Sequence, residues 1–157
     1  MDGQRAKSFE VGQILSVSIE KVAHGGHFIA RHEGQVIFVR HAIPGELVDV
    51  EITSTGSSFY RADVVKVIQA SPDRVTPPCH YSHASGCGGC DFQHIDLARQ
   101  RGLKADVIAE QFSRIAKMEV DVTVEEIGDP LHWRTRISSA TDDQGQIGFY
   151  ADRKSVV

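Results

Sequence analysis

Apolar and polar side chains alternate along most of the first seventy residues. Between residues 14 and 20 every second side chain is apolar: Leu15, Val17 and Ile19. This two-residue period is typical of a half-buried strand. The alternation returns in 47–52, and glycines or the turn sequence IPGE separate the other short apolar runs. About five short strands at this spacing predict a small β-barrel, because closure leaves no strand edge exposed.

The pattern changes after residue 70. The segment SPDRVTPP contains three prolines, which cannot donate to a strand ladder. We therefore expect a barrel at 7–70, a linker at 71–78 and a second region at 79–157.

The second region is predicted to hold one helix and a small α+β part. Apolar residues at helical spacing predict a helix from Asp96 to Met118, with Asp96 as its N-cap. Alternating valines predict a strand over 120–124, and turn residues predict a hairpin around 142–145.

Composition excludes a membrane span and gives no sign of general nucleic-acid binding. The chain has 157 residues, of which 41% are hydrophobic and 24% charged, and no apolar run approaches the roughly 20 residues of a membrane helix. The polar N-terminus lacks a signal peptide's apolar core, so we expect a cytoplasmic protein. A net charge of −4 means that any RNA contact must rest on a local patch or on a partner.

All three cysteines lie close together, at Cys79, Cys87 and Cys90. An odd number of cysteines in a reducing compartment favours metal or redox chemistry over disulfides. Cys87 and Cys90 form a Cys-x2-Cys pair, but no βαβ pattern of a thioredoxin surrounds it. An iron–sulfur cluster normally needs a fourth cysteine. Spacing alone favours a zinc site, whose fourth ligand is sought among three histidines: His80, His83 and His94.

Several stretches resemble one family, the SAM-dependent RNA uracil-C5 methyltransferases, across essentially the whole chain. The stretch GGHFIARHEGQVIFVRHAIPGELVDVEI resembles the TRAM domain, a small OB-like barrel, and CGGCDFQHI resembles the cysteine motif of that family. HWRTRISSA and GQIGFYADRKSVV resemble the strands that follow.

The resemblance implies a [4Fe–4S] cluster bound by Cys79, Cys87 and Cys90, with a fourth cysteine expected beyond Val157. One departure is the seven residues between Cys79 and Cys87, where the family commonly has about five, a difference that a surface loop tolerates. The Rossmann-like SAM-binding domain and the catalytic cysteine are absent from the sequence, so we expect no catalytic residue in it. SAM would bind only to the full-length protein.

Barrels of this type bind single strands by stacking bases on aromatic rings beside cations. Six barrel residues are therefore candidates for RNA contact: Phe28, Arg31, Phe38, Arg40, Tyr60 and Arg61. Phe28 and Phe38 also suit the barrel core. Arg134 and Arg136 alternate on an expected strand, so they would share one face and either clamp phosphates or pair with Glu125 and Glu126.

The sequence thus predicts the RNA-binding, iron–sulfur front part of an RNA uracil-C5 methyltransferase, acting on rRNA or tRNA as a monomer. A zinc-stabilised RNA-binding module without catalytic activity is the alternative. A barrel that mediates protein contacts is a third interpretation.

Overall fold

A computed structural model describes residues 8–151 and 155–156 of the chain. It divides into two compact units, Met1–Thr76 and Pro77–Val157.

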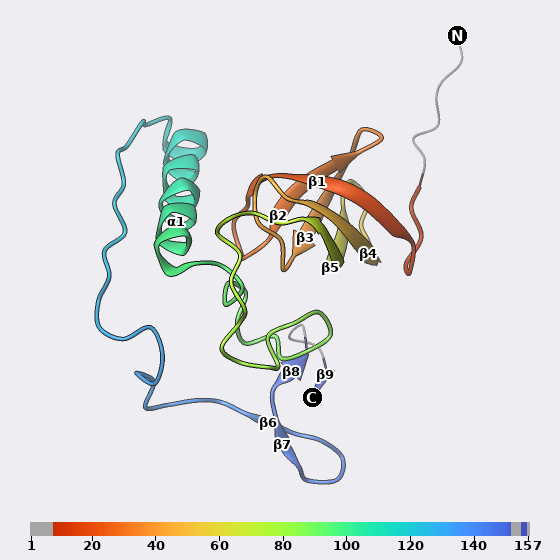
Figure 1. Cartoon of the computed structure of the whole chain (residues 1–157), viewed down its shortest axis with the longest axis vertical. Coiled ribbons are helices and arrows are strands. Elements are labelled where there is room, and N and C mark those ends of the chain that lie inside the picture. The colour runs from red at the N-terminus through yellow and green to blue at the C-terminus, as the bar shows by residue number, and fades with distance from the viewer. Residues whose placement is uncertain (1–7, 152–154, 157) are drawn as a thin grey trace. The chain divides into compact units, whose positions relative to one another are not determined.

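The first unit is a closed five-stranded barrel, as the alternation predicted (Figure 1). Its strands run around the barrel in the order β1-β2-β3-β5-β4, and β4 pairs back onto β1. All pairs are antiparallel except β3 with β5. The strand bounds are β1 Ile14–Val22, β2 Phe28–His32, β3 Gln35–Arg40, β4 Leu47–Thr55 and β5 Tyr60–Gln69.

Alternate residues of the strands fill the barrel interior. Leu15, Val17 and Ile19 of β1 are buried and their polar neighbours are exposed, which confirms the two-residue period. The large side chains with no exposed surface include Phe28, Ile37, Val39, Val48, Val50 and Ile52. Full burial of such a side chain contributes about 1.5–3 kcal/mol, so this interior is the main source of the barrel's stability.

Two residues, Glu33 and Gly34, connect β2 to β3. Both have positive φ, 47° and 80°, as a type I′ hairpin turn requires. The right-handed twist of this turn matches that of the strands it joins, and it fixes the β2–β3 register, in which Ile29 pairs with Phe38.

The turn IPGE places the Glu46 carboxylate inside the protein, with 1% of the residue exposed. Glu46 accepts hydrogen bonds from the backbone N–H groups of Ile43 (2.9 Å) and Ser71 (3.1 Å) and from the guanidinium of Arg74. Arg74 also donates to the carbonyl of His41 at 2.8 Å. These contacts hold residues 71–74 against the barrel, and the division between the units falls after Thr76.

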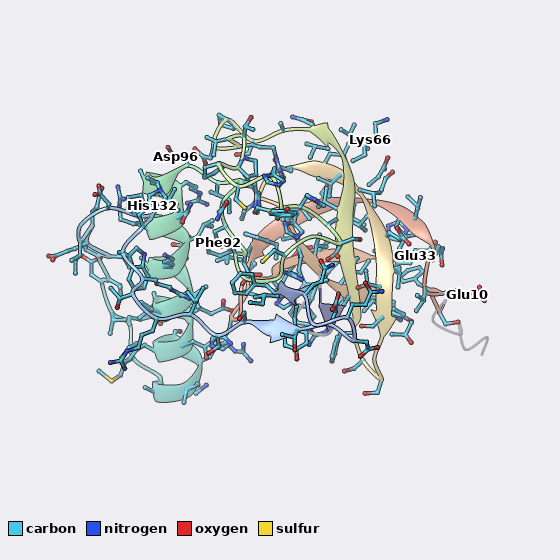
Figure 2. The ribbon with its side chains drawn as sticks, turned by 90° about the horizontal axis from the view of Figure 1, so that it is seen from below. Glu10, Glu33, Lys66, Phe92, Asp96 and His132 are labelled. Carbon is cyan, nitrogen blue, oxygen red and sulfur yellow. The ribbon has the colours of Figure 1, made fainter. Side chains whose placement is uncertain are left out.

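The second unit contains one long helix. α1 spans Leu97–Gln111 and continues as a π-helical turn, η1, over Phe112–Ala116. Asp96 is its N-cap, since its carboxylate accepts from the N–H groups of Ala98 (2.9 Å) and Arg99 (3.4 Å), as predicted (Figure 2). Lys117, with φ of 56°, ends the helix in the left-handed conformation.

The predicted strand over 120–124 is wrong. Residues 119–139, all of them described, form neither helix nor strand, and Figure 1 shows an extended segment there. Val120, Val122 and Val124 are half-buried between exposed neighbours, so the alternation is present, but no strand of the described residues pairs with it. A strand needs a neighbour to receive its backbone hydrogen bonds.

Two short hairpins follow. β6 (Ala140–Thr141) pairs with β7 (Ile147–Gly148), and β8 (Tyr150–Ala151) pairs with β9 (Ser155–Val156). The first confirms the hairpin predicted around 142–145. Within the described ranges, no helix has the length and apolar character needed to cross a membrane.

Candidate functional site

The cysteine loop, residues 79–95, is folded tightly on its own backbone. The N–H of Ser82 donates to the carbonyl of Cys79 (3.0 Å), and that of Cys87 donates to the carbonyl of Tyr81 (2.9 Å). Gly86 fits where no other residue does, because an added Cβ would lie 2.2 Å from the Tyr81 carbonyl oxygen. The loop therefore has a specific shape that the sequence GCGGC alone does not reveal.

A segment sixty residues further along the chain supports this loop. The N–H of Gly88 donates to the carbonyl of Tyr150 at 2.9 Å, and Cys87 forms an isolated antiparallel bridge with Ala151. Ala151 is buried, with 8% of its surface exposed. The start of β8 thus holds the Cys87-Gly88 backbone through one hydrogen bond and one bridge.

Two of the three cysteine sulfurs accept hydrogen bonds. The N–H of Gly89 donates to Cys87 Sγ at 3.4 Å, and Gln93 Nε2 donates to Cys90 Sγ at 3.1 Å. Gln93 Oε1 accepts from the N–H of Cys79 at 3.3 Å. None of the three cysteines is in a disulfide. N–H donors directed at sulfur are typical of cysteines that bind metal as thiolates.

The histidines suggested as a fourth ligand lie in different surroundings. The His80 ring packs on Tyr81, with centroids 3.9 Å apart, and His83 Nδ1 lies 2.7 Å from the Ala84 carbonyl oxygen. Both are exposed, whereas His94 is buried with 3% of its surface exposed. The Ser82 hydroxyl is also buried, and it has no hydrogen-bond partner among the described residues.

The residues of the loop fit a thiolate-bound metal in chemistry. Three thiols lie on one loop, N–H groups donate to two of their sulfurs, and the buried Ser82 hydroxyl is left to interact with a further group. Among the described residues, however, no three His, Cys, Asp or Glu side chains already stand in a metal-binding arrangement. Binding would therefore require the three sulfurs to converge and a further ligand to join them.

The RNA contacts predicted on the barrel separate into buried and exposed residues. Phe28 has no exposed surface and Tyr60 only 8%, so both belong to the interior and neither can stack on a base. Arg31 is exposed on β2 and forms an ion pair with Glu20. Arg40 pairs in register with Asp63 of β5. Of the predicted cations, Arg31 is thus paired with a carboxylate, and Arg40 lies near enough to Asp63 for their charges to interact.

Asp63 carries the charge that faces Arg40. It is 6% exposed, and this burial raises the pKa of its carboxyl; the charge of Arg40 opposes the shift and the Glu51 carboxylate adds to it.

The outer face of the barrel carries an aromatic row, defined as His27, Phe38, Phe59 and Arg61. Phe38 points outward between the buried Ile37 and Val39 and pairs in register with Arg61. Its ring meets the rings of His27 and Phe59 edge to face, at 6.2 and 5.4 Å between centroids. The guanidinium of Arg61 lies 5.8 Å from the centroid of Phe59. Sequence reasoning missed Phe59 and gave His27 no role, since only strand pairing brings them beside Phe38.

Arg134 and Arg136 do not lie on a strand, which corrects the prediction that they share one face. Both are exposed in the segment 119–139. The guanidinium of Arg134 lies 5.1 Å from the centroid of the exposed Trp133 ring. The acidic residue expected as a partner, Glu126, instead pairs with Arg101 of α1 at 3.0 Å.

Known proteins resemble nearly the whole chain, and one family model matches its first part. The TRAM domain family matches residues 8–65. An uncharacterised RNA methyltransferase of Streptomyces avermitilis is 43% identical over 162 residues, covering 94% of this chain and 37% of that protein. A 23S rRNA (uracil(1939)-C(5))-methyltransferase of Shewanella amazonensis is 38% identical, covering 94% of this chain and 34% of that protein.

Among solved structures, a conserved protein of Methanococcus maripaludis matches 36% of this chain at 38% identity, with a TM-score of 0.34. The chain spans about a third of the length of the curated relatives it matches. It contains a TRAM domain and is homologous, over nearly its whole length, to proteins that are named RNA methyltransferases.

Proposed function

We propose that this chain is the RNA-binding and metal-binding region of an RNA methyltransferase. The observation that carries the RNA half is the aromatic row on the barrel, where two phenylalanine rings and Arg61 lie together on the outer surface. Aromatic faces stack unpaired bases at about 1–3 kcal/mol per base, and an adjacent arginine adds attraction to base and phosphate.

The charge of the chain favours this mode of binding over general attraction to phosphate. With a net charge of −4 and with Arg31 and Arg40 facing carboxylates, the barrel has few cations available for a phosphate backbone. Stacking must then supply most of the affinity. The ligand is single-stranded RNA, because the base faces of a duplex are covered by their neighbours.

A titration of the protein into two fluorescently labelled RNAs tests this proposal. One is a single strand, and the other is the same strand annealed to its complement. We expect tighter binding of the single strand, with a shallow dependence of log K on log salt because few phosphates are neutralised. Equal binding of both RNAs, or a steep salt dependence, would contradict stacking as the source of affinity.

We propose further that the full-length protein transfers a methyl group from SAM to C5 of a uridine in rRNA or tRNA. The name of the Shewanella relative supports this substrate, as does the resemblance of the cysteine motif. We assign no catalytic role to any described residue; this region binds the RNA. The proposal also implies a monomer in the reducing cytoplasm, where thiols remain free.

For the metal, we propose a [4Fe–4S] cluster on Cys79, Cys87 and Cys90, completed by a ligand outside the described residues. The free thiols and the N–H donors at two sulfurs support it. Bound there, a cluster supplies a rigid cross-link of the loop. Anaerobic reconstitution followed by iron and sulfide analysis should give a brown protein with about four irons per chain.

Zinc is the second candidate metal, favoured by the buried His94, which lies four residues after Cys90. A colourless protein with one zinc, lost on His94→Ala but retained on His80→Ala, would establish zinc and reject the cluster. Iron retained in both histidine variants would reject zinc.

A further inference from the structure

Gln93 connects two cysteines that are eleven positions apart. Its side chain accepts from the backbone N–H of Cys79 at 3.3 Å and donates to Cys90 Sγ at 3.1 Å. The orientation of the carboxamide follows from chemistry, because a backbone N–H can only donate and so must face the oxygen. The NH2 group is then left to face the sulfur.

These two contacts have different consequences. The hydrogen bond from the Cys79 N–H to Gln93 fixes the position of the loop's first cysteine relative to its last. The hydrogen bond from Gln93 to Cys90 Sγ directs a donor at an atom that carries negative charge when it is a thiolate or a metal ligand. Donors of this kind stabilise the more negative, reduced state of an iron–sulfur centre and so raise its reduction potential.

The buried hydroxyl of Ser82 is an independent sign that the loop is arranged around a group. Ser82 lies between Cys79 and Cys87 in sequence, and within the described part of the chain its Oγ lacks a hydrogen-bond partner. A buried hydroxyl without a partner is costly, by about 1–3 kcal/mol. Such a cost is relieved when a bound group supplies the partner.

We propose that Gln93 is a positioning residue of the cysteine loop, which holds Cys79 in place beside Cys90 and donates a hydrogen bond to the Cys90 sulfur of the bound centre. The hydrogen bond to the bound centre rests on the proposed metal site. The positioning of Cys79 does not, because it applies to the metal-free loop as well.

Two substitutions separate the contacts. Gln93→Glu keeps an oxygen for the Cys79 N–H and removes the donor to Cys90, whereas Gln93→Leu removes both. Gln144→Glu is the matched control, because it makes the same change of charge. Gln144 lies exposed in the hairpin turn between β6 and β7.

The first measurement uses the metal-free chain and amide hydrogen exchange. We expect Gln93→Leu to speed exchange at the Cys79 amide at least tenfold, whereas Gln144→Glu leaves it unchanged. Unchanged exchange in Gln93→Leu would overturn the positioning role, whether or not the protein binds metal.

The second measurement uses the reconstituted full-length protein. We expect Gln93→Glu to lower the reduction potential at unchanged iron content, and Gln93→Leu to release iron to a chelator about 10–100 times faster, the usual effect of removing a partner of a ligand. Potentials and release rates equal to those of Gln144→Glu would overturn the donor role. Wild-type full-length protein that takes up no metal would instead reject the proposed site, and the exchange result would still decide the role of Gln93.

Discussion

Arg74 and Glu46 form a two-point ion pair, with Arg74 Nε 2.6 Å from Glu46 Oε1 and Arg74 Nη2 2.7 Å from Glu46 Oε2. The glutamate side chain is fully buried, and the arginine side chain is 21% exposed. Two backbone N–H groups complete the carboxylate's hydrogen bonds. This pair attaches the segment after β5 to the turn before β4.

Arg74→Met should therefore destabilise the barrel strongly. It leaves the Glu46 carboxylate buried without its cation, a change that typically costs about 3–5 kcal/mol. Denaturant unfolding measures the loss. Glu20→Gln is the control, since the ion pair of Glu20 with Arg31 is exposed and its removal should cost about 0–1 kcal/mol. Similar losses in both variants would mean that Glu46 is not held as described.

The stability of the barrel should also fall in acid. Burial alone would raise the pKa of Glu46, but the hydrogen bonds from Arg74, Ser71 and Ile43 and the charge of Arg74 hold that pKa below its ordinary value of 4.5. A carboxyl with a lowered folded-state pKa stabilises the fold above its unfolded pKa, and this contribution disappears as pH falls through the folded value.

Wild-type protein should thus lose unfolding free energy as pH drops below about 4.5, and Glu46→Gln should show a flatter profile over that range. Parallel profiles for the two proteins would show that Glu46 does not titrate differently in the folded state.

Asp63→Asn should stabilise the protein at neutral pH, because the charge of this carboxylate opposes folding. Because burial raises the pKa of Asp63, the folded protein binds its proton more tightly than the unfolded chain and is destabilised by its charge at neutral pH. Replacing the carboxylate with an amide should raise the melting temperature at pH 7 and have less effect near pH 4. A lower melting temperature at pH 7 would mean that the contact with Arg40 outweighs burial.

Two glycine substitutions should act in opposite directions. Gly86→Ala places a Cβ 2.2 Å from the Tyr81 carbonyl oxygen, so the cysteine loop must open and lose protection in hydrogen exchange. Gly102→Ala meets nothing closer than Arg99 Nη1 at 3.5 Å and lies within α1, where alanine is favoured by about 1 kcal/mol. It should raise stability. Equal exchange in the loop of Gly86→Ala and wild type would contradict the packing described.

The features that the sequence predicted correctly depend on patterns within short segments of the chain. Alternation in β1 predicted which residues line the barrel, and Asp96 before an apolar period predicted the start of α1. Phe28 has the same alternation and also the residue type of an RNA contact, so only its full burial decides that it belongs to the core.

Contacts between distant residues were not predictable in this way. Glu46 and Arg74 are 28 positions apart, and Phe38 meets Phe59 only because β3 and β5 pair in parallel. The strand expected over 120–124 failed for the same reason, since alternation does not say whether a neighbouring strand exists.

The most direct test of the account is the affinity for single-stranded RNA of a Phe38→Ala, Phe59→Ala double variant. Phe112→Ala is the control, because Phe112 is an aromatic residue of η1 with 44% of its surface exposed. We expect the double variant to bind at least tenfold more weakly, from the loss of about 1–3 kcal/mol per stacked base, while the barrel stays folded at the assay temperature and Phe112→Ala binds as wild type. Wild-type affinity in the double variant would contradict the account.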